Sequence, residues 1–176
     1  MNPGQTERYS RQIKLPQVGE TGQQRLLDAR VLIIGMGGLG SPVSMYLAAA
    51  GVGHLVISDY DRVDESNLQR QIVHTQASIN ELKATSARDT LLRLNPAVSV
   101  DALNYELDDE ELREQVTQAD VVVDCTDNFP SRFELNRISL ATGTPVVSGA
   151  AIRWEGQVST FIPKNPDSPC YQCLYP

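Results

Sequence analysis

The chain of 176 residues is 41% hydrophobic and carries 15 Lys and Arg residues against 22 Asp and Glu residues, a formal net charge of -7 at pH 7. This length predicts one domain with a sizeable core, and an acidic chain without a run of basic residues is a poor candidate for nucleic-acid binding. No stretch approaches the roughly 18 apolar residues of a membrane span, the N-terminus lacks a signal-peptide pattern, and three cysteines do not make a secreted disulfide framework. We therefore expect a cytoplasmic protein with no membrane partner.

The first predicted elements of the sheet are a strand, a glycine loop and a helix. Residues 31–34 form a short β-branched run, which is typical of a buried strand, and the glycine loop 35–40 follows at once. Ser41 is the expected helix N-cap, with Pro42 at the first helical position, and Gly51 is the expected helix end. With a second strand after the helix, this segment predicts a βαβ unit.

The rest of the chain alternates in the same way. We expect strands at 55–57, 98–103, 121–123, 145–147 and 157–162, and helices at 81–94, from the cap Asp108 to 118, and at 131–141. Strands that alternate with helices predict an α/β fold with a Rossmann-like, doubly wound, mostly parallel sheet. The last strand alternates in polarity, as an antiparallel edge strand would, and the segment before the sheet predicts an N-terminal helical region.

The glycine loop predicts a nucleotide site. Gly35-Met36-Gly37-Gly38-Leu39-Gly40 fits G-x-G-x-x-G between a strand and a helix, where backbone N–H groups and the helix dipole can meet phosphate oxygens. Asp59 ends the second strand, where its carboxylate can accept a hydrogen bond from a ribose hydroxyl. The alternative is that the glycines only permit close packing and that Asp59 is a turn residue.

The loop after the second strand, residues 61–71, is rich in groups that could handle a triphosphate. Arg70 can direct two N–H groups at phosphate oxygens, and Lys83 adds a point charge near the start of the next helix. NAD is the usual ligand of such a glycine loop, but hydride transfer needs nothing that binds a triphosphate. The alternative interpretation is a solvated polar loop with surface charges.

Residues 124–128 follow the apolar strand 121–123 and predict a magnesium site. Mg²⁺ in proteins is usually held by one or two carboxylates together with phosphates and water, and Asp127 is the candidate carboxylate. Asp127 could instead be the N-cap of the helix that follows Pro130. Cys125 adjoins the strand and is expected to be an inert buried thiol.

Taken together, these motifs resemble the MoeB/ThiF (HesA/MoeB/ThiF) adenylyltransferases, bacterial relatives of ubiquitin-activating enzymes. The motifs occur in the order typical of the family and span nearly the whole chain: Arg8-Tyr9-Ser10-Arg11-Gln12, the glycine loop 35–40, Ser66-Asn67-Leu68-Gln69-Arg70-Gln71, Asp124-Cys125-Thr126-Asp127-Asn128, Ser148-Gly149-Ala150 and Pro169-Cys170-Tyr171-Gln172-Cys173. Several separate motifs in order are far more specific than one glycine loop.

The resemblance implies an enzyme that uses ATP and Mg²⁺ to adenylate the C-terminal carboxylate of a small ubiquitin-like sulfur-carrier protein, either the molybdopterin-synthase small subunit or the thiazole-biosynthesis carrier. It also implies a homodimer, in which Arg11 reaches the triphosphate bound by the neighbouring subunit. The implied catalytic residues are Arg11, Arg70, Lys83 and Asp127, and the implied nucleotide-binding residues are Gly38, Asp59, Ser66, Asn67, Leu68, Gln69, Arg70, Lys83, Asp127 and Asn128.

The spacing of Cys170 and Cys173 suits two ligands of a structural Zn²⁺ site, but a closed site needs four. The resemblance implies a second C-x-x-C nearer the C-terminus, so we expect a truncated sequence. The expected organisation is a single ATP-binding adenylyltransferase domain over 1–176, with an N-terminal helical extension at 1–29 and the start of a zinc-binding segment at 163–176. A thioredoxin-like redox pair is the alternative, although the βαβ context expected for it is missing here.

Two other classes of function stay open from sequence. An NAD-dependent oxidoreductase would need a group that handles the hydride chemistry, such as a Tyr-x-x-x-Lys pair, and no tyrosine of this chain has a lysine at that spacing. A noncatalytic nucleotide-binding or carrier-docking module could keep the glycine loop and lose the basic residues and Asp127. The joint presence of Arg11, Arg70, Lys83 and Asp127 favours an enzyme.

Overall fold

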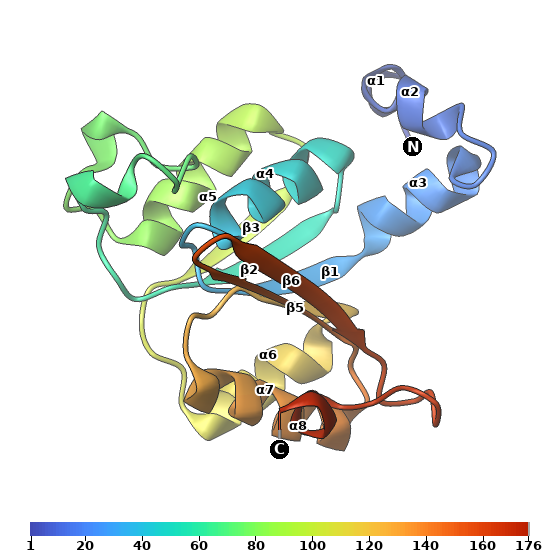
Figure 1. The fold of residues 1–176 in the computed structure, drawn as a ribbon. Coiled ribbons are helices and arrows are strands. Elements are labelled where there is room, and N and C mark those ends of the chain that lie inside the picture. Colours follow the sequence, from blue (N-terminus) through green and yellow to red (C-terminus); the bar gives the residue numbers. More distant parts are fainter. Residues whose placement is uncertain (176) are drawn as a thin grey trace.

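A computed structural model describes residues 1–175 and contains one mixed sheet between two layers of helices (Figure 1). The strands are β1 (Arg30–Ile34), β2 (His54–Ser58), β3 (Ser99–Leu103), β4 (Val121–Asp124), β5 (Val146–Ile152) and β6 (Glu155–Phe161). Their order in the sheet is β3-β2-β1-β4-β5-β6, with all pairs parallel except β5 and β6, which are antiparallel. This arrangement confirms the predicted Rossmann-like fold with an antiparallel edge strand.

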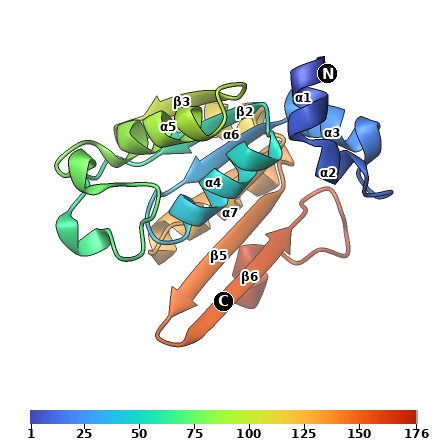
Figure 2. The same cartoon turned by 90° about the horizontal axis from the view of Figure 1, so that it is seen from above.

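The helices cover both faces of this sheet. They are α1 (Pro3–Arg8), α2 (Ser10–Ile13), α3 (Gly19–Asp28), α4 (Gly40–Ala50), α5 (Lys83–Leu94), α6 (Asp109–Gln118), α7 (Phe129–Thr142) and α8 (Tyr171–Leu174), with short 3-10 helices η1 (Glu65–Asn67) and η2 (Gln76–Ser78). Figures 1 and 2 show α4 and α5 on one face and α6 and α7 on the other, while the β5–β6 hairpin projects beyond the helices. In residues 1–175, no helix is long and apolar enough to cross a membrane.

The buried strand β1 explains why the core has two halves. Val31 and Ile33 point to the α4–α5 side, whereas Leu32, between them, points to the α6–α7 side. All three are 7% exposed or less, because helices cover both faces of the strand. A run of apolar residues without alternation is what a strand at the centre of a doubly wound sheet requires, and the prediction of a buried strand is confirmed.

The N-terminal helices dock on the C-terminal end of α4. Gln12 and Gln23 both donate side-chain hydrogen bonds to the carbonyl of Ala50, at 3.1 and 3.0 Å. The ring of Tyr9 is buried, and its hydroxyl accepts a hydrogen bond from the Asn95 side chain at 2.8 Å. These polar contacts satisfy groups that the end of a helix leaves without partners, and they fix the predicted N-terminal helical region against the sheet domain.

One predicted helix start is wrong. The helix α4 begins at Gly40 with Leu39 as its N-cap and no capping side chain, so Ser41 lies inside the helix, fully buried. The backbone turns early because Gly40 packs against the carbonyl of Gly35, where a β-carbon would come within 1.9 Å of the oxygen. The backbone N–H groups of the first turn therefore have no side-chain cap, and an anion can take that place.

Candidate functional site

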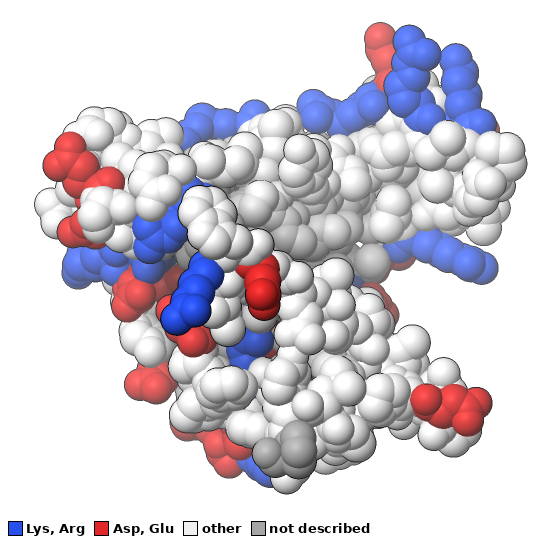
Figure 3. All heavy atoms as spheres, in the orientation of Figure 1, with Lys and Arg blue, Asp and Glu red and all other residues white. Residues whose placement is uncertain are grey.

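The candidate site lies at the carboxyl ends of β1, β2 and β4. In the sheet, β1 has β2 on one side and β4 on the other, so the chain connections leave β1 and β4 toward opposite faces. Ligands of open α/β sheets bind in the crevice at such a point. Figure 3 shows basic and acidic side chains near one another in the part of the view where Figure 1 draws the turn of the β5–β6 hairpin, while the surface to the right of them is largely uncharged.

The glycine loop has a backbone shape that side chains would disturb. Gly35 has a φ of +92°, and a β-carbon there would approach the carbonyl oxygen of Cys125 to 2.9 Å. Only glycine adopts this conformation without strain, so the loop can pass directly over the end of β4. The position of the loop at the end of β1 and the start of α4 is the one predicted from sequence.

Asp59 is fastened to the glycine loop. Its carboxylate accepts hydrogen bonds from the backbone N–H of Met36 at 2.7 Å and from that of Asp61 at 2.9 Å. A carboxylate has about four lone-pair positions, so acceptors remain for a ribose hydroxyl. Asp59 therefore stabilises the turn, as the alternative interpretation expected, and it also has an acceptor oxygen available to a ligand.

The stem of Arg70 lies on the glycine loop. A β-carbon on Gly38 would lie 3.5 Å from Cδ and 3.6 Å from Cγ of Arg70, so the stem of the arginine covers this glycine. The guanidinium is held by one hydrogen bond, from Nη1 to the carbonyl of Ser66 at 3.3 Å. Since the guanidinium carries five N–H donors, most of them remain for phosphate oxygens.

Lys83 is buried at the start of α5 and is paired. Its ammonium lies 2.9 Å from a carboxylate oxygen of Asp61, and the two side chains are 8% and 61% exposed. A buried ammonium needs such a partner, and its two further N–H groups can still reach an anion. The sequence indicated Lys83 as a point charge, but not that Asp61 holds it in place.

The segment 66–69 spans the end of η1 and the turn after it. Ser66 donates to the carboxylate of Asp64 through its hydroxyl at 2.6 Å and its backbone N–H at 2.8 Å, and these bonds lower the pKa of Asp64. Asn67 donates to the Ser66 hydroxyl at 3.1 Å. Leu68 is half-buried and Gln69 is exposed. The roles of Leu68 and Gln69 stay predictions.

Asp127 and Asn128 differ in what their side chains do. Asn128 is the N-cap of α7, and its side-chain oxygen accepts from the backbone N–H of Ser131 at 3.0 Å. The alternative interpretation of Asp127 as this N-cap is therefore wrong. Asp127 is exposed and has no hydrogen-bond or ion-pair partner in the described part of the chain. Its carboxylate is available to a cation.

Asp124, at the start of the loop 124–128, and two residues behind this loop, Arg132 and Ser148, were not among the predicted site residues. Asp124 is buried and accepts from the Thr126 backbone and hydroxyl at 3.0 and 2.7 Å and from the Ser148 hydroxyl at 2.7 Å. Arg132 donates to the carbonyls of Thr126 and, at 2.9 Å, Gly149. A charged residue at the end of an apolar strand must find such partners, and that signal was present in the sequence.

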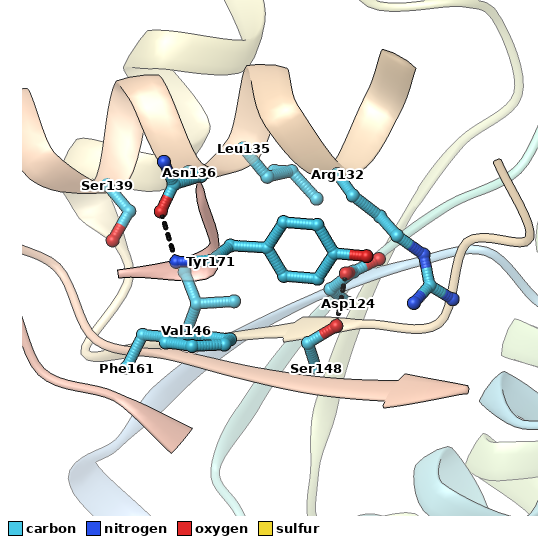
Figure 4. Close-up of a pocket in the computed structure, with 9 residues that line it drawn as sticks. All are labelled: Asp124, Arg132, Leu135, Asn136, Ser139, Val146, Ser148, Phe161 and Tyr171. Carbon is cyan, nitrogen blue, oxygen red and sulfur yellow. Dashed lines mark hydrogen bonds between the residues drawn. The ribbon is translucent and has the colours of Figure 1, made fainter. Parts of the chain in front are cut away.

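A small cavity lies beside these residues, on the α7 side of the sheet (Figure 4). The ring of Tyr171 points from α8 toward Arg132 and Asp124, and the carboxylate of Asp124 accepts a hydrogen bond from the Ser148 hydroxyl. The glycine loop leads into α4, on the opposite face. The cavity is therefore lined by the residues that hold the loop 124–128 in place, and it is not the nucleotide site predicted at the glycine loop.

The three cysteines have two different environments. Burial, with the negative charge of Asp124, raises the pKa of Cys125 to about 12, which confirms the expected inert thiol. Cys170 and Cys173 are free thiols with their sulfurs 3.4 Å apart. Burial opposes thiolate formation at Cys170, but hydrogen bonds from Cys173 lower its pKa overall. Within residues 1–175 there is no cluster of three or more His, Cys, Asp or Glu side chains that could hold a metal ion.

Arg11 is not part of this assembly. It is exposed on α2, and Figure 1 shows α2 near the amino-terminal end of β1, away from the loop that connects β1 to α4. The structure therefore brings together Gly38, Asp59, Arg70 and the loop of Asn67 around the glycine loop, and it does not bring Arg11 to the same place.

Comparison with known proteins gives one family. The family model described as ThiF family matches residues 9–176. The SAMP-activating enzyme E1 of Haloferax volcanii is 48% identical over 172 residues, which are 98% of this chain and 63% of that protein. The molybdopterin-synthase adenylyltransferase of Escherichia coli is 49% identical over 167 residues, 95% of this chain and 67% of that protein. The sulfur carrier protein ThiS adenylyltransferase of Escherichia coli is 46% identical over 176 residues, 100% of this chain and 70% of that protein.

Solved structures agree with this fold. The crystal structure of PaaA matches with a TM-score of 0.85 at 25% identity and covers 98% of this chain and 55% of that chain. The crystal structure of Escherichia coli MccB with ATP matches with a TM-score of 0.82 at 26% identity and covers 94% of this chain and 50% of that chain. This chain thus spans about two thirds of the curated relatives and about half of the solved structures.

Proposed function

Because this chain belongs to the ThiF family, we propose that it adenylates the C-terminal carboxylate of a small ubiquitin-like sulfur-carrier protein and releases pyrophosphate from ATP. The observation that carries the proposal is the stem of Arg70 lying over Gly38, which puts a guanidinium on an uncapped glycine loop. The names of the relatives include both a molybdopterin-synthase and a ThiS adenylyltransferase, so the substrate is proposed as a class of carrier.

The reaction needs positioning and charge neutralisation more than acid–base chemistry. An oxygen of the carrier's terminal carboxylate attacks the α-phosphorus of ATP, a P–O bond forms, and the bond to the pyrophosphate oxygen breaks. An α-carboxyl group titrates at about 3.5, so the nucleophile is already ionised near neutral pH. Arg70 and Lys83 would offset the charge that moves to the leaving pyrophosphate, while Asp59 orients the ribose.

ATP fits this site better than NAD does. Arg70, which covers Gly38, and Lys83, which is paired with Asp61 after the end of β2, would suit three phosphates, and no relative reported above is named for hydride transfer. A noncatalytic module is also disfavoured, since the curated relatives are named as enzymes.

Asp127 would hold the Mg²⁺ ion. Its carboxylate is exposed beside the site and has no partner in residues 1–175, whereas the neighbouring Asp124 already accepts three hydrogen bonds. The free carboxylate of Asp127 suits a cation ligand, because Mg²⁺ binds through one or two carboxylates together with phosphate oxygens. When bound, the ion supplies positive charge against the phosphates of ATP.

Cys170 and Cys173 would supply two of the four ligands of a structural Zn²⁺ site. Their sulfurs are 3.4 Å apart, and two thiolates on one tetrahedral zinc lie about 3.8 Å apart, so small side-chain rotations suffice. The lowered pKa of Cys170 favours the thiolate that a metal requires. The other two ligands would have to come from outside the group of side chains that surrounds Cys170 and Cys173 in residues 1–175.

The protein would act as a homodimer in the cytoplasm, where ATP and the carrier are available. The support for a dimer is the position of Arg11, which is exposed on α2 and separated from the glycine loop of its own chain. In a dimer, this arginine would reach the triphosphate bound by the neighbouring subunit. The region 1–175 would then be one adenylation domain whose active site draws basic residues from both chains.

Exchange of labelled pyrophosphate into ATP tests the function. We expect exchange to require both the enzyme and a sulfur-carrier protein with a free C-terminal carboxylate, and to stop with a carrier whose C-terminus is amidated. Comparing the molybdopterin-synthase carrier with the thiazole carrier would identify the substrate. Binding of NAD without any ATP–pyrophosphate exchange by either carrier would contradict the proposal.

A further inference from the structure

A row of hydrogen-bonded side chains runs from Asp64 to the glycine loop. The Ser66 hydroxyl donates to Asp64 at 2.6 Å, the Asn67 Nδ2 donates to the Ser66 hydroxyl oxygen at 3.1 Å, and the Gln71 Nε2 donates to the Asn67 Oδ1 at 2.8 Å. Ser66 and Asn67, in the middle of this row, each accept on one side and donate on the other. We refer to Asp64, Ser66, Asn67 and Gln71 as the polar relay.

The ionised carboxylate of Asp64 sets the direction of every bond in the relay. A carboxylate only accepts, so the single hydroxyl proton of Ser66 is directed at Asp64, and the Ser66 oxygen must accept from its other neighbour. The Asn67 side chain can supply that bond only from its nitrogen, which turns its oxygen to the opposite side. Gln71 must then donate to this oxygen, as it does.

The orientation of the Gln71 amide leaves its side-chain oxygen without a hydrogen bond. Its side chain is 4% exposed, and its Oε1 is buried without a hydrogen-bond partner in residues 1–175. A buried acceptor without a partner is unfavourable. Rotating the amide could move this oxygen, but would direct it at the Asn67 oxygen. The fold therefore keeps the donor end of Gln71 on Asn67 and leaves its own carbonyl unsatisfied.

The relay ends beside the nucleotide loop. The Gln71 Nε2 lies 3.8 Å from the position of a β-carbon on Gly37, and Arg70, the preceding residue, covers Gly38. In this orientation the Asn67 amide has used one N–H on Ser66, and the second N–H has no partner among the described residues. The residue that carries this free donor accepts a hydrogen bond from Gln71, and Gln71 lies against Gly37 of the loop that we have assigned to phosphates.

We propose that Asp64, Ser66 and Gln71 are positioning residues that fix the Asn67 side chain with its amide N–H toward the phosphates of ATP. This inference rests on the proposed function, because it takes the anion on the glycine loop to be the triphosphate. It adds a role for Gln71 and Asp64, neither of which touches the nucleotide in this scheme.

The test reverses the relay. In Gln71→Glu both ends of the row accept, so Asn67 faces an oxygen whichever way its amide turns. In Asp64→Asn/Gln71→Glu the row can run backward: the introduced amide at position 64 donates to Ser66, Ser66 donates to the Asn67 oxygen, and the Asn67 nitrogen donates to the introduced carboxylate at position 71. The double variant has the same net charge as the wild type, and Gln76→Glu, on an exposed residue of η2, is the control for an added charge.

The measurements are the melting temperature and the dissociation constants of ATP and AMP by calorimetry, without carrier. We expect Gln71→Glu to lower the melting temperature and weaken ATP binding by about tenfold or more, with AMP affinity within about twofold of the wild type. In the double variant the melting temperature should recover while ATP binding stays weak, because the Asn67 nitrogen then faces position 71. Gln76→Glu should leave the melting temperature and both affinities near the wild-type values.

ATP affinity that recovers together with the melting temperature would show a structural role only and would overturn the proposal. Equal losses for ATP and AMP in Gln71→Glu would overturn it as well, as would a double variant less stable than Gln71→Glu. The melting temperatures test the direction of the relay even if the wild type lacks pyrophosphate exchange, so failure of the proposed function is seen separately.

Discussion

Asp124 and Asp127 stand three residues apart and serve different purposes. Asp124 is buried and its carboxylate accepts three hydrogen bonds, which hold the loop and Ser148 together. Asp127 is exposed at the same end of β4 and contributes no such bond in residues 1–175. A carboxylate that does nothing for the fold is free to act on a ligand, and this contrast separates the two roles experimentally.

Asp127→Ala should leave the fold intact and reduce ATP–pyrophosphate exchange by about 10²- to 10³-fold, because the Mg²⁺ ion loses its carboxylate ligand. Thermal unfolding checks the fold, and Asp167→Ala removes another exposed carboxylate as the control. Exchange within a factor of about two of the wild type would contradict the assignment of Asp127.

The shifted pKa of His74 makes the stability of the folded protein depend on pH. Burial has the largest effect and lowers the pKa of His74 below its usual 6.5; the hydrogen bond to the Met36 carbonyl partly opposes it, and the charges of Lys83 and Asp59 have smaller effects of opposite sign. The ring contacts the Ser86 hydroxyl at 3.0 Å and the Met36 carbonyl at 3.3 Å. The folded state thus favours the neutral imidazole.

The free energy of unfolding should therefore fall as the pH drops below 6.5 toward the folded-state pKa, since only the unfolded chain takes up the proton in that window. The slope from one such group is at most about 1.4 kcal/mol per pH unit. Urea denaturation of the wild type and of His74→Asn, at several pH values between about 7.5 and 5, measures how the free energy of unfolding changes with pH. The variant is expected to be less stable at the upper pH but to lose less on acidification, and equal slopes would refute the account.

Among the secondary-structure elements, α4 connects the glycine loop to the docking site of the N-terminal helices. Its first turn carries the uncapped glycine loop, and its last turn receives the N-terminal helices through Gln12, Gln23 and the carbonyl of Ala50. Gly51 ends the helix in the left-handed conformation, with a φ of +86°. A shift at either end would move the other, because the helix between them is a packed, rigid rod.

Gly51→Ala should lower the free energy of unfolding by about 2–4 kcal/mol, since a β-carbon there would be strained by the positive φ and would lie 2.5 Å from the ring of Tyr9. Gly156→Ala is the matched control, because nothing lies within 4 Å of its β-carbon position. Urea denaturation measures both variants. Equal stabilities would contradict the docking of Tyr9 on this turn.

The short helix α8 carries the proposed zinc ligands. One helical turn forms over Tyr171–Leu174, with Cys170 as its N-cap residue. We expect about one Zn²⁺ per subunit of the native protein, lost in Cys170→Ala/Cys173→Ala together with thermal stability, and retained in Cys125→Ala. Metal affinity should weaken as the pH falls. A metal-free protein with a Cys170–Cys173 disulfide would favour the redox interpretation instead.

At the scale of the whole molecule, the two groups of proposed catalytic residues are separated. The glycine loop, Arg70 and Asp127 lie at the carboxyl ends of the strands, whereas Arg11 lies on α2, beyond the other end of the sheet (Figure 1). A folded sheet cannot bend to close this separation. If both groups act on one ATP molecule, the active site must include two chains.

Mixing Arg11→Ala chains with Asp127→Ala chains should restore exchange activity, because each mixed dimer contains one site with neither substitution. About one quarter of the wild-type activity is expected from an equal mixture, since half of the dimers are mixed and each has one intact site of two. Subunit exchange is verified with differently tagged chains. Persistent inactivity of verified mixed dimers would contradict action across the dimer.

The sequence by itself determined the elements whose signals are local. The buried run of β1, the glycine loop, the Asp108 cap of α6 and the end of α4 at Gly51 all follow from neighbouring residues and were predicted correctly. Alternation of these elements was enough for the parallel sheet, because a βαβ crossover admits essentially one hand. The site residues could be proposed because they follow the carboxyl ends of predicted strands.

The tertiary structure decided what depends on contacts between distant segments. No local signal shows that Arg70 lies on Gly38, that Asp61 pairs with Lys83, or that Gln71 orients Asn67 beside the loop. The early start of α4 has the same origin, since Gly40 packs against Gly35 and overrides the local preference for Ser41 as N-cap. Such contacts form only when the sheet brings the loops to one edge, and the direction of each hydrogen bond is then fixed by the neighbours that packing supplies.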